Sequence, residues 1–167
     1  MQAPPELKDL EKILKNTNIK LFDAVEAVLV KDGKILKHTD STGYYSKIAS
    51  YITHCKLNKA KIEYNSKDNL IYFNNKTFAY EIIIGQYTDT NSKKSILEKA
   101  NNIQNKFDKS LIDGILYFIT FNKNQSDFRN NIKNVITSGF VNLKCTKKRL
   151  PKALETLQLR YGFTYTE

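Results

Sequence analysis

The chain has 167 residues, of which 41% are hydrophobic and 26% charged, and its formal net charge is +10 at pH 7. This composition excludes a disordered chain and leaves room for one domain with a genuine core. No apolar run is long enough to cross a bilayer, and the N-terminal residues lack the apolar centre of a secretory signal. We therefore expect a cytoplasmic protein without a membrane span.

The positive charge is spread along the chain, and only Lys147, Lys148 and Arg149 form a run of three. Such a charge favours an acidic partner such as nucleic acid, an anionic lipid or an acidic protein. The codon bias of an AT-rich genome would give the same excess of lysine and asparagine, so both explanations stay open. Cys55 and Cys145 lack the spacing of a zinc site and are predicted to be buried thiols.

The first third of the chain predicts a helix, a hairpin and a second helix. Pro5 to Lys15 carries leucines at helical spacing after a proline that suits a first turn. Ala24 to Thr39 contains two β-rich runs around Asp32-Gly33, which is typical of a tight hairpin turn. Gly43 to Cys55 again has apolar residues at helical spacing.

The stretch Ala60 to Gly85 predicts a meander of three strands, because β-branched and aromatic runs alternate with polar turns. The middle run, Leu70 to Phe73, is apolar throughout, which predicts a strand covered on both faces. In the third run, Phe78, Tyr80, Ile82 and Ile84 share one face.

Beyond the meander, the pattern predicts a helix over residues 92–107, a strand over Leu111 to Phe121 and a helix over Ser126 to Ile136. A short strand over Phe140 to Cys145 and a helix over Pro151 to Tyr161 complete the chain. The predicted order is α-ββ-α-βββ-α followed by β-α-β-α.

Motifs with defined chemistry are missing from the sequence. Phosphate-binding glycine loops, serine nucleophile motifs and the HExxH zinc motif do not occur. The two histidines, His38 and His54, have no partner at metal-ligand spacing. No constellation therefore argues for catalysis on its own.

Asp68 opens the second meander strand and Glu81 lies in the third. A helix, three strands, a helix and a further strand with carboxylates at these places resemble the core of the PD-(D/E)XK nucleases. That resemblance implies that Asp68 and Glu81 bind Mg²⁺ or Mn²⁺ for phosphodiester hydrolysis. The sequence departs from the family where a lysine is expected, because residue 83 is Ile83. On the alternative reading, Asp68 caps a turn and Glu81 is a paired or partly exposed strand residue.

If the chain acts on nucleic acid, its contacts with the phosphates are expected from lysines and one arginine. Lys93 and Lys94 stand at the start of the helix after the meander and would also be the substitutes for the missing lysine. The remaining candidates are Lys147, Lys148 and Arg149.

A second resemblance covers more of the chain. LKDLEKILK, VEAVLVKDGKILKHT, YSKIASYI and the meander with its following helix resemble the roadblock/dynein light chain family, relatives of the longin and profilin-like folds. The match covers residues 5–108 and leaves residues 109–167 as a C-terminal extension packed on the same core. It implies an α+β fold whose five-stranded antiparallel sheet has the first and last helices on one face and the middle helix on the other.

This resemblance also implies a non-catalytic protein without cofactors, a homodimer that scaffolds or regulates a small Ras-like GTPase or a related complex. Dimers of this type pair the first meander strand with its twin, and an exposed edge strand favours such pairing. The implied interface consists of Ala60, Ile62 and Tyr64 on the edge and Tyr44, Tyr45, Ile48, Tyr51 and Ile52 on the helix. The alternative is that these side chains fill the core of a single chain.

We prefer the scaffold hypothesis on the sequence, because it explains the hairpin and does not require the missing lysine. The nuclease or a plain nucleic-acid-binding protein is the alternative. The two differ in one structural feature: parallel pairing around Leu111 to Phe121 would favour the nuclease core.

Overall fold

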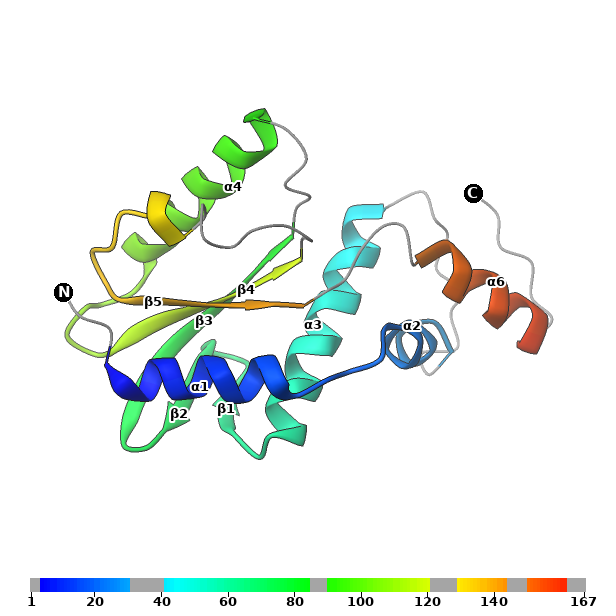
Figure 1. Ribbon diagram of the computed structural model, residues 1–167, viewed down its shortest axis with the longest axis horizontal. Helices are drawn as coiled ribbons and strands as arrows, with labels where there is room; N and C mark the ends of the chain where they lie inside the picture. Colours follow the sequence, from blue (N-terminus) through cyan, green and yellow to red (C-terminus); the bar gives the residue numbers. More distant parts are fainter. Residues whose placement is uncertain (1–3, 31–40, 85–89, 121–128, 144–149, 162–167) are drawn as a thin grey trace.

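The computed structural model describes residues 4–30, 41–84, 90–120, 129–143 and 150–161 (Figure 1). The helices are α1 (Pro5–Asn16), α2 (Leu21–Val30), α3 (Ser41–Lys59), α4 (Thr90–Ile103), the 3-10 helix η1 (Gln104–Lys106) and α6 (Leu150–Tyr161). The strands are β1 (Glu63–Asn65), β2 (Leu70–Phe73), β3 (Lys76–Ile84), β4 (Gly114–Thr120) and β5 (Ser138–Asn142).

The five strands form one sheet in the order β1-β2-β3-β4-β5. β1, β2 and β3 are the predicted antiparallel meander, with Leu70 opposite Ala79. β4 is parallel to β3, and β5 is parallel to β4. The prediction of a wholly antiparallel sheet is therefore wrong, because α4 and η1 cross over the sheet and return the chain to run in the same direction as β3.

Two hydrophobic cores lie on opposite faces of the sheet. On one face, α1 and α3 pack against Phe78, Tyr80 and Phe118, and α2 and α6 continue this layer beyond α3 (Figure 1). On the other face, α4 packs against Ala79, Ile83 and Tyr117. Helices cover both faces as expected, but the expected arrangement is wrong: α1 shares its face with α3, and α4 lies with η1 on the other.

The predicted hairpin over Ala24 to Thr39 is wrong in its first half, where the chain forms α2. Residues 31–39 of that prediction lie outside the described residues. Ala24, Val25 and Val28 are buried in the core of α1 and α3, and this spacing fits a helix as well as a strand. Tertiary packing therefore overrides the strand preference of the valines.

Most of the remaining elements follow the predictions. Residues 129–131 are helical, but 132–137 form bends, so the helix predicted over Ser126 to Ile136 is wrong in its second half, and its first residues are not described. The side chain of Gln104 accounts for the bends, because its Oε1 accepts the backbone N–H groups of Val135 and Ile136 at 2.9 and 3.1 Å. In β2, Tyr72 is 37% exposed, so this strand is not covered on both faces.

Two buried charges hold α1 in place. Glu11, only 7% exposed, accepts the N–H of Phe140 at the outer edge of β5 and pairs with Arg129. Lys56 of α3 donates to the carbonyls of Leu14 and Thr17 at 3.2 and 2.6 Å. The carbonyl of Leu14 also accepts the backbone N–H of Thr17 at 3.3 Å, so the ammonium group of Lys56 adds a second donor at the C-terminus of α1 and binds the carbonyl of the residue that follows the helix.

Candidate functional site

Glu81 lies in the middle of β3, opposite Tyr117 of β4. Its strand neighbours Ala79 and Ile83 are buried under α4, and its own side chain is 15% exposed. The Oε1 atom of Glu81 accepts a hydrogen bond from the Nζ atom of Lys106 at 3.0 Å. Lys106 belongs to η1, so an ion pair links the centre of β3 to the end of the crossover.

Asp68 closes the turn between β1 and β2. Its Oδ2 accepts from the side-chain amide of Asn65 at 3.1 Å, and Asn65 Oδ1 accepts the N–H groups of Lys67 and Asp68. Asn69 has a φ of 55°, a left-handed conformation that asparagine tolerates better than most residues. The carboxylate of Asp68 therefore serves the turn, as the alternative reading expected.

The backbone brings Asp68 and Glu81 to neighbouring places without joining their carboxylates. Asn69 accepts the N–H of Tyr80 at 2.9 Å, so Asp68 is the next residue along the ladder toward Glu81. The left-handed Asn69 interrupts the strand alternation that would place both carboxylates on one face.

The residues present do not fit a preassembled Mg²⁺ or Mn²⁺ site. One oxygen of Glu81 is occupied by Lys106, Asp68 is bonded within its turn, and Ile83 is fully buried where the motif has its lysine. Among the described residues, no group of three or more His, Cys, Asp or Glu could hold a metal ion. The sequence suggested Lys93 or Lys94 as the lysine of this site, but the lysine that pairs with Glu81 among the described side chains is Lys106.

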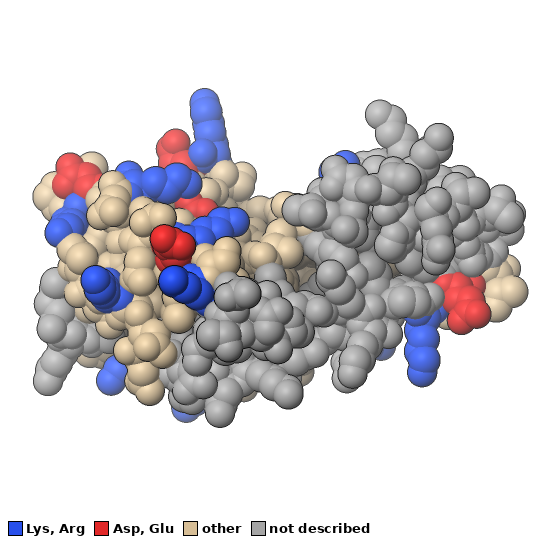
Figure 2. Space-filling view, turned by 90° about the horizontal axis from the view of Figure 1, so that it is seen from above, with Lys and Arg blue, Asp and Glu red and all other residues tan. Residues whose placement is uncertain are grey.

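The flank of α4 carries a shallow cavity of about 490 Å³. Ser95, Lys99, Asn102 and Lys106 line it at spacings of three and four, together with Glu98 and Ile103. Lys94, directly before Ser95, is exposed but is not part of this lining. Figure 2, which looks down on this side, shows basic side chains interspersed with acidic ones. The sequence pointed to Lys94 but missed Lys99 and Lys106, although their helical spacing with Ser95 was visible.

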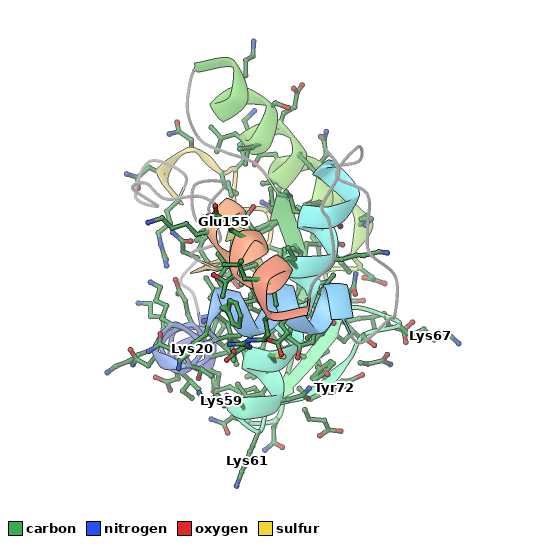
Figure 3. The ribbon with its side chains drawn as sticks, turned by 90° about the vertical axis from the view of Figure 1, so that its right-hand side faces the viewer. Lys20, Lys59, Lys61, Lys67, Tyr72 and Glu155 are labelled. Atoms are coloured by element: carbon green, nitrogen blue, oxygen red, sulfur yellow. The ribbon has the colours of Figure 1, made fainter. Side chains whose placement is uncertain are left out.

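Other described lysines are distributed over the rest of the molecule. Lys20, Lys59 and Lys61 lie toward one end in Figure 3, whereas Lys67 projects from the β1–β2 turn at another side. Lys59 donates to the carbonyl of Asn18 at 3.0 Å, so part of the positive charge supports helix ends. Lys147, Lys148 and Arg149 and the side chain of Lys93 lie outside the described residues.

β1 lies at an edge of the sheet, as predicted, because it is first in the strand order. The prediction of a strand over Ala60 to Asn65 is wrong in its first half, since β1 comprises only Glu63–Asn65 and the chain turns at Lys61, whose φ is 57°. Of the residues assigned to a dimer interface, Ile48, Ile52 and Ile62 are buried in the core of the chain itself. Ala60, Tyr64 and Tyr51 are half-buried against that core. Tyr44 and Tyr45 belong to α3, but their side chains are not among those described.

His54, which the sequence left without a partner, joins three elements. Its Nδ1 lies 3.3 Å from Ser50 Oγ on α3, and its Nε2 lies 3.0 Å from the hydroxyl of Tyr80 on β3. Its ring stacks on Tyr64 of β1 with centroids 5.3 Å apart. Burial lowers the pKa of His54 and raises the pKa of Tyr80 to about 12, so both groups are uncharged at neutral pH.

No protein-family model, curated protein or solved structure matches this chain. Within the described part of the chain, no helix is long and apolar enough to cross a membrane. The chain is an α+β protein with an open, mixed five-stranded sheet between two helical layers.

Proposed function

We propose that the chain is a nucleic-acid-binding protein built on a core like that of the PD-(D/E)XK nucleases, without a metal centre at Asp68 and Glu81. The observation that supports this is the parallel pairing of β3 with β4 after the α4 crossover. The run α3-β1-β2-β3-α4-β4 has the order of that core, and parallel pairing at this place is the feature that separates the nuclease core from the roadblock fold.

The charge of the chain is consistent with this role. A net charge of +10 attracts a polyanion whatever its sequence, mainly through contacts with phosphates. In the described surface, α4 offers two exposed lysines, Lys94 and Lys99, and Lys99 lines the cavity with the hydroxyl of Ser95 and the amide of Asn102. These groups are donors that suit phosphate oxygens. Lys106 is already paired with Glu81 and contributes less net charge.

Binding of labelled duplex and single-stranded oligonucleotides over a series of salt concentrations tests the proposal. We expect log K to fall linearly with log salt, because bound phosphates release counterions. The double substitution Lys94→Gln/Lys99→Gln should weaken binding and reduce the steepness by about 1 to 2. Lys8→Gln/Lys12→Gln, an equal charge change on the exposed side of α1, is the matched control.

The proposal has two parts, nucleic-acid binding by the chain and the use of α4 as the interface, and the results test them separately. Absence of saturable binding at low salt would overturn it. Equal weakening by both double substitutions would retain nucleic-acid binding but remove α4 as its interface.

A dimerising scaffold, with a small GTPase as a possible partner, remains the second candidate because β1 is an edge of the sheet. Its free backbone groups can pair with those of a second copy. We place it second because the fold implied by the roadblock resemblance is antiparallel throughout, unlike this sheet. Light scattering measures the mass in solution, and a monomer at high protein concentration would count against the scaffold.

A further inference from the structure

A groove of about 680 Å³ runs along α3 beside α2. This volume is within the range of small-ligand sites, roughly 300–1,000 Å³. One wall is formed by Ala27 and Val28 of α2. The other is a stripe of α3 at spacings of mostly three and four residues: Ser46, Lys47, Ser50, Tyr51, His54, Cys55 and Asn58.

We propose that this groove binds a nucleoside monophosphate. The site goes beyond the proposed function, because α3 and α4 lie on opposite faces of the sheet. It is therefore a small-ligand site separate from the basic flank of α4.

The charge in the groove suits a single anionic group. Lys47 is exposed, and no Asp or Glu is among the described residues that line the groove. Burial lowers the pKa of His54. The hydrogen bond with Cys55, then burial and the charge of Asp23 on α2, raise the pKa of Tyr51. Imidazole and phenol are therefore neutral, and Lys47 with the hydroxyl of Ser46 is the place for the phosphate.

The rest of the lining suits a heterocyclic base. The hydroxyl of Ser50 and the amide of Asn58 can both donate and accept hydrogen bonds, as recognition of a base edge requires. Ala27 and Val28 provide the apolar surface against which a ring can pack. From Ser46 to Asn58 the stripe extends about 18 Å along the helix, which leaves room for the base and the phosphate at different places.

The wall of the groove is held rigidly. His54 is fixed through Ser50 and Tyr80 and by stacking on Tyr64. α2 is held against α6 by the ion pair of Glu26 with Arg160 at 2.9 Å. A site whose walls are fixed before binding loses less entropy when the ligand enters.

Isothermal titration of the full chain with each of the four nucleoside monophosphates, adenosine and inorganic phosphate tests the proposal. We expect saturable binding of at least one monophosphate, and weaker binding of adenosine and of phosphate alone. Lys47→Gln should weaken binding about tenfold, the usual value of a hydrogen bond to a charged group. Ala27→Phe should abolish binding by filling the groove, and Lys99→Gln on α4 should leave it unchanged.

Circular dichroism melting of each variant ensures that a loss of binding is not a loss of fold. The proposal is overturned if no monophosphate binds saturably, if folded Lys47→Gln and Ala27→Phe bind as the original chain does, or if inorganic phosphate binds equally well.

The same chemistry could come from a free nucleotide or from one nucleotide of a single strand. Competition by a short single-stranded oligonucleotide distinguishes the two sources. If the groove takes one nucleotide of a single strand, the oligonucleotide displaces the bound monophosphate at equal nucleotide concentration. If the groove takes only a free nucleotide, the monophosphate stays bound. The Lys94→Gln/Lys99→Gln variant separates this site from the proposed function. It should lose affinity for duplex while it keeps affinity for the monophosphate.

Discussion

Lys106 Nζ lies 3.0 Å from Glu81 Oε1, so the carboxylate that a nuclease core would use for a metal is paired with a cation of the chain itself. A ligand that binds only the folded state raises the free energy of unfolding by RT ln(1 + [L]/Kd). We therefore predict that Mg²⁺ or Mn²⁺ raises the melting temperature no more in the original chain than in Glu81→Gln or Asp68→Asn. Melting curves with and without Mn²⁺ measure this.

Cleavage of labelled DNA under the same conditions is a second test of whether Glu81 binds a metal ion instead of Lys106. A Mn²⁺-dependent rise in melting temperature, or a Mn²⁺-dependent nicking activity, that Glu81→Gln removes would show that the pair opens to take a metal. Lys106→Ala is the control for loss of the ion pair itself. This pair is expected to contribute only about 0–1 kcal/mol to the free energy of unfolding, because Lys106 is exposed.

The buried carboxylate of Glu11 is expected to be among the costliest side chains to remove. Glu11→Ala removes the carboxylate that accepts the N–H of Phe140 and pairs with the half-buried Arg129. We predict a loss of about 3 kcal/mol in the free energy of unfolding. Glu11→Gln keeps an acceptor for Phe140 and should cost less.

Urea denaturation measures both Glu11 variants. Lys15→Ala is the matched control, because Lys15 pairs with the same carboxylate at 3.6 Å but is itself exposed. A loss with Lys15→Ala as large as that with Glu11→Ala would show that the Arg129 and Phe140 contacts are not the cause.

Lys56→Met is predicted to destabilise the chain by about 2 kcal/mol, although methionine fits the same space. The ammonium group donates to the carbonyls of Leu14 and Thr17, and methionine removes both of these charge-assisted hydrogen bonds at the end of α1. Thermal denaturation compares it with Lys59→Met, whose exposed bond to Asn18 should contribute much less. Equal effects would contradict the role of burial.

Stability should depend on pH through His54. Burial holds its pKa in the folded chain below the ordinary value of 6.5, so between these two values the unfolded chain binds more protons. The free energy of unfolding therefore falls as the pH decreases below 6.5 and stops falling through this group below the folded pKa. His54→Gln should reduce this dependence.

Melting temperatures at pH about 7.5 and about 5.5 cover the range in which histidine titrates. His38→Gln replaces the other histidine of the chain and is the control. If His38→Gln reduces the acid sensitivity and His54→Gln does not, the assignment to His54 is wrong.

Local patterns in the sequence were enough to place most elements. The leucines of α1 and the apolar stripe of α4 have the spacing of a helix, and polar turns separate the β-rich runs of the meander. The structure confirms these helices and the antiparallel pairing of the meander. The turn role of Asp68 was also readable, because its neighbours Asn65 and Asn69 are typical turn residues.

Tertiary structure decided what short-range patterns leave open. The run from Ala24 to Val30 fits a strand or a helix, and only packing against α3 and α6 selects the helix. The direction of β4 depends on where the crossover through α4 delivers the chain, which no property of Leu111 to Phe121 encodes. Lys106 with Glu81 and His54 with Tyr80 meet only after folding, because each pair is about 25 residues apart in sequence and is brought together by the sheet.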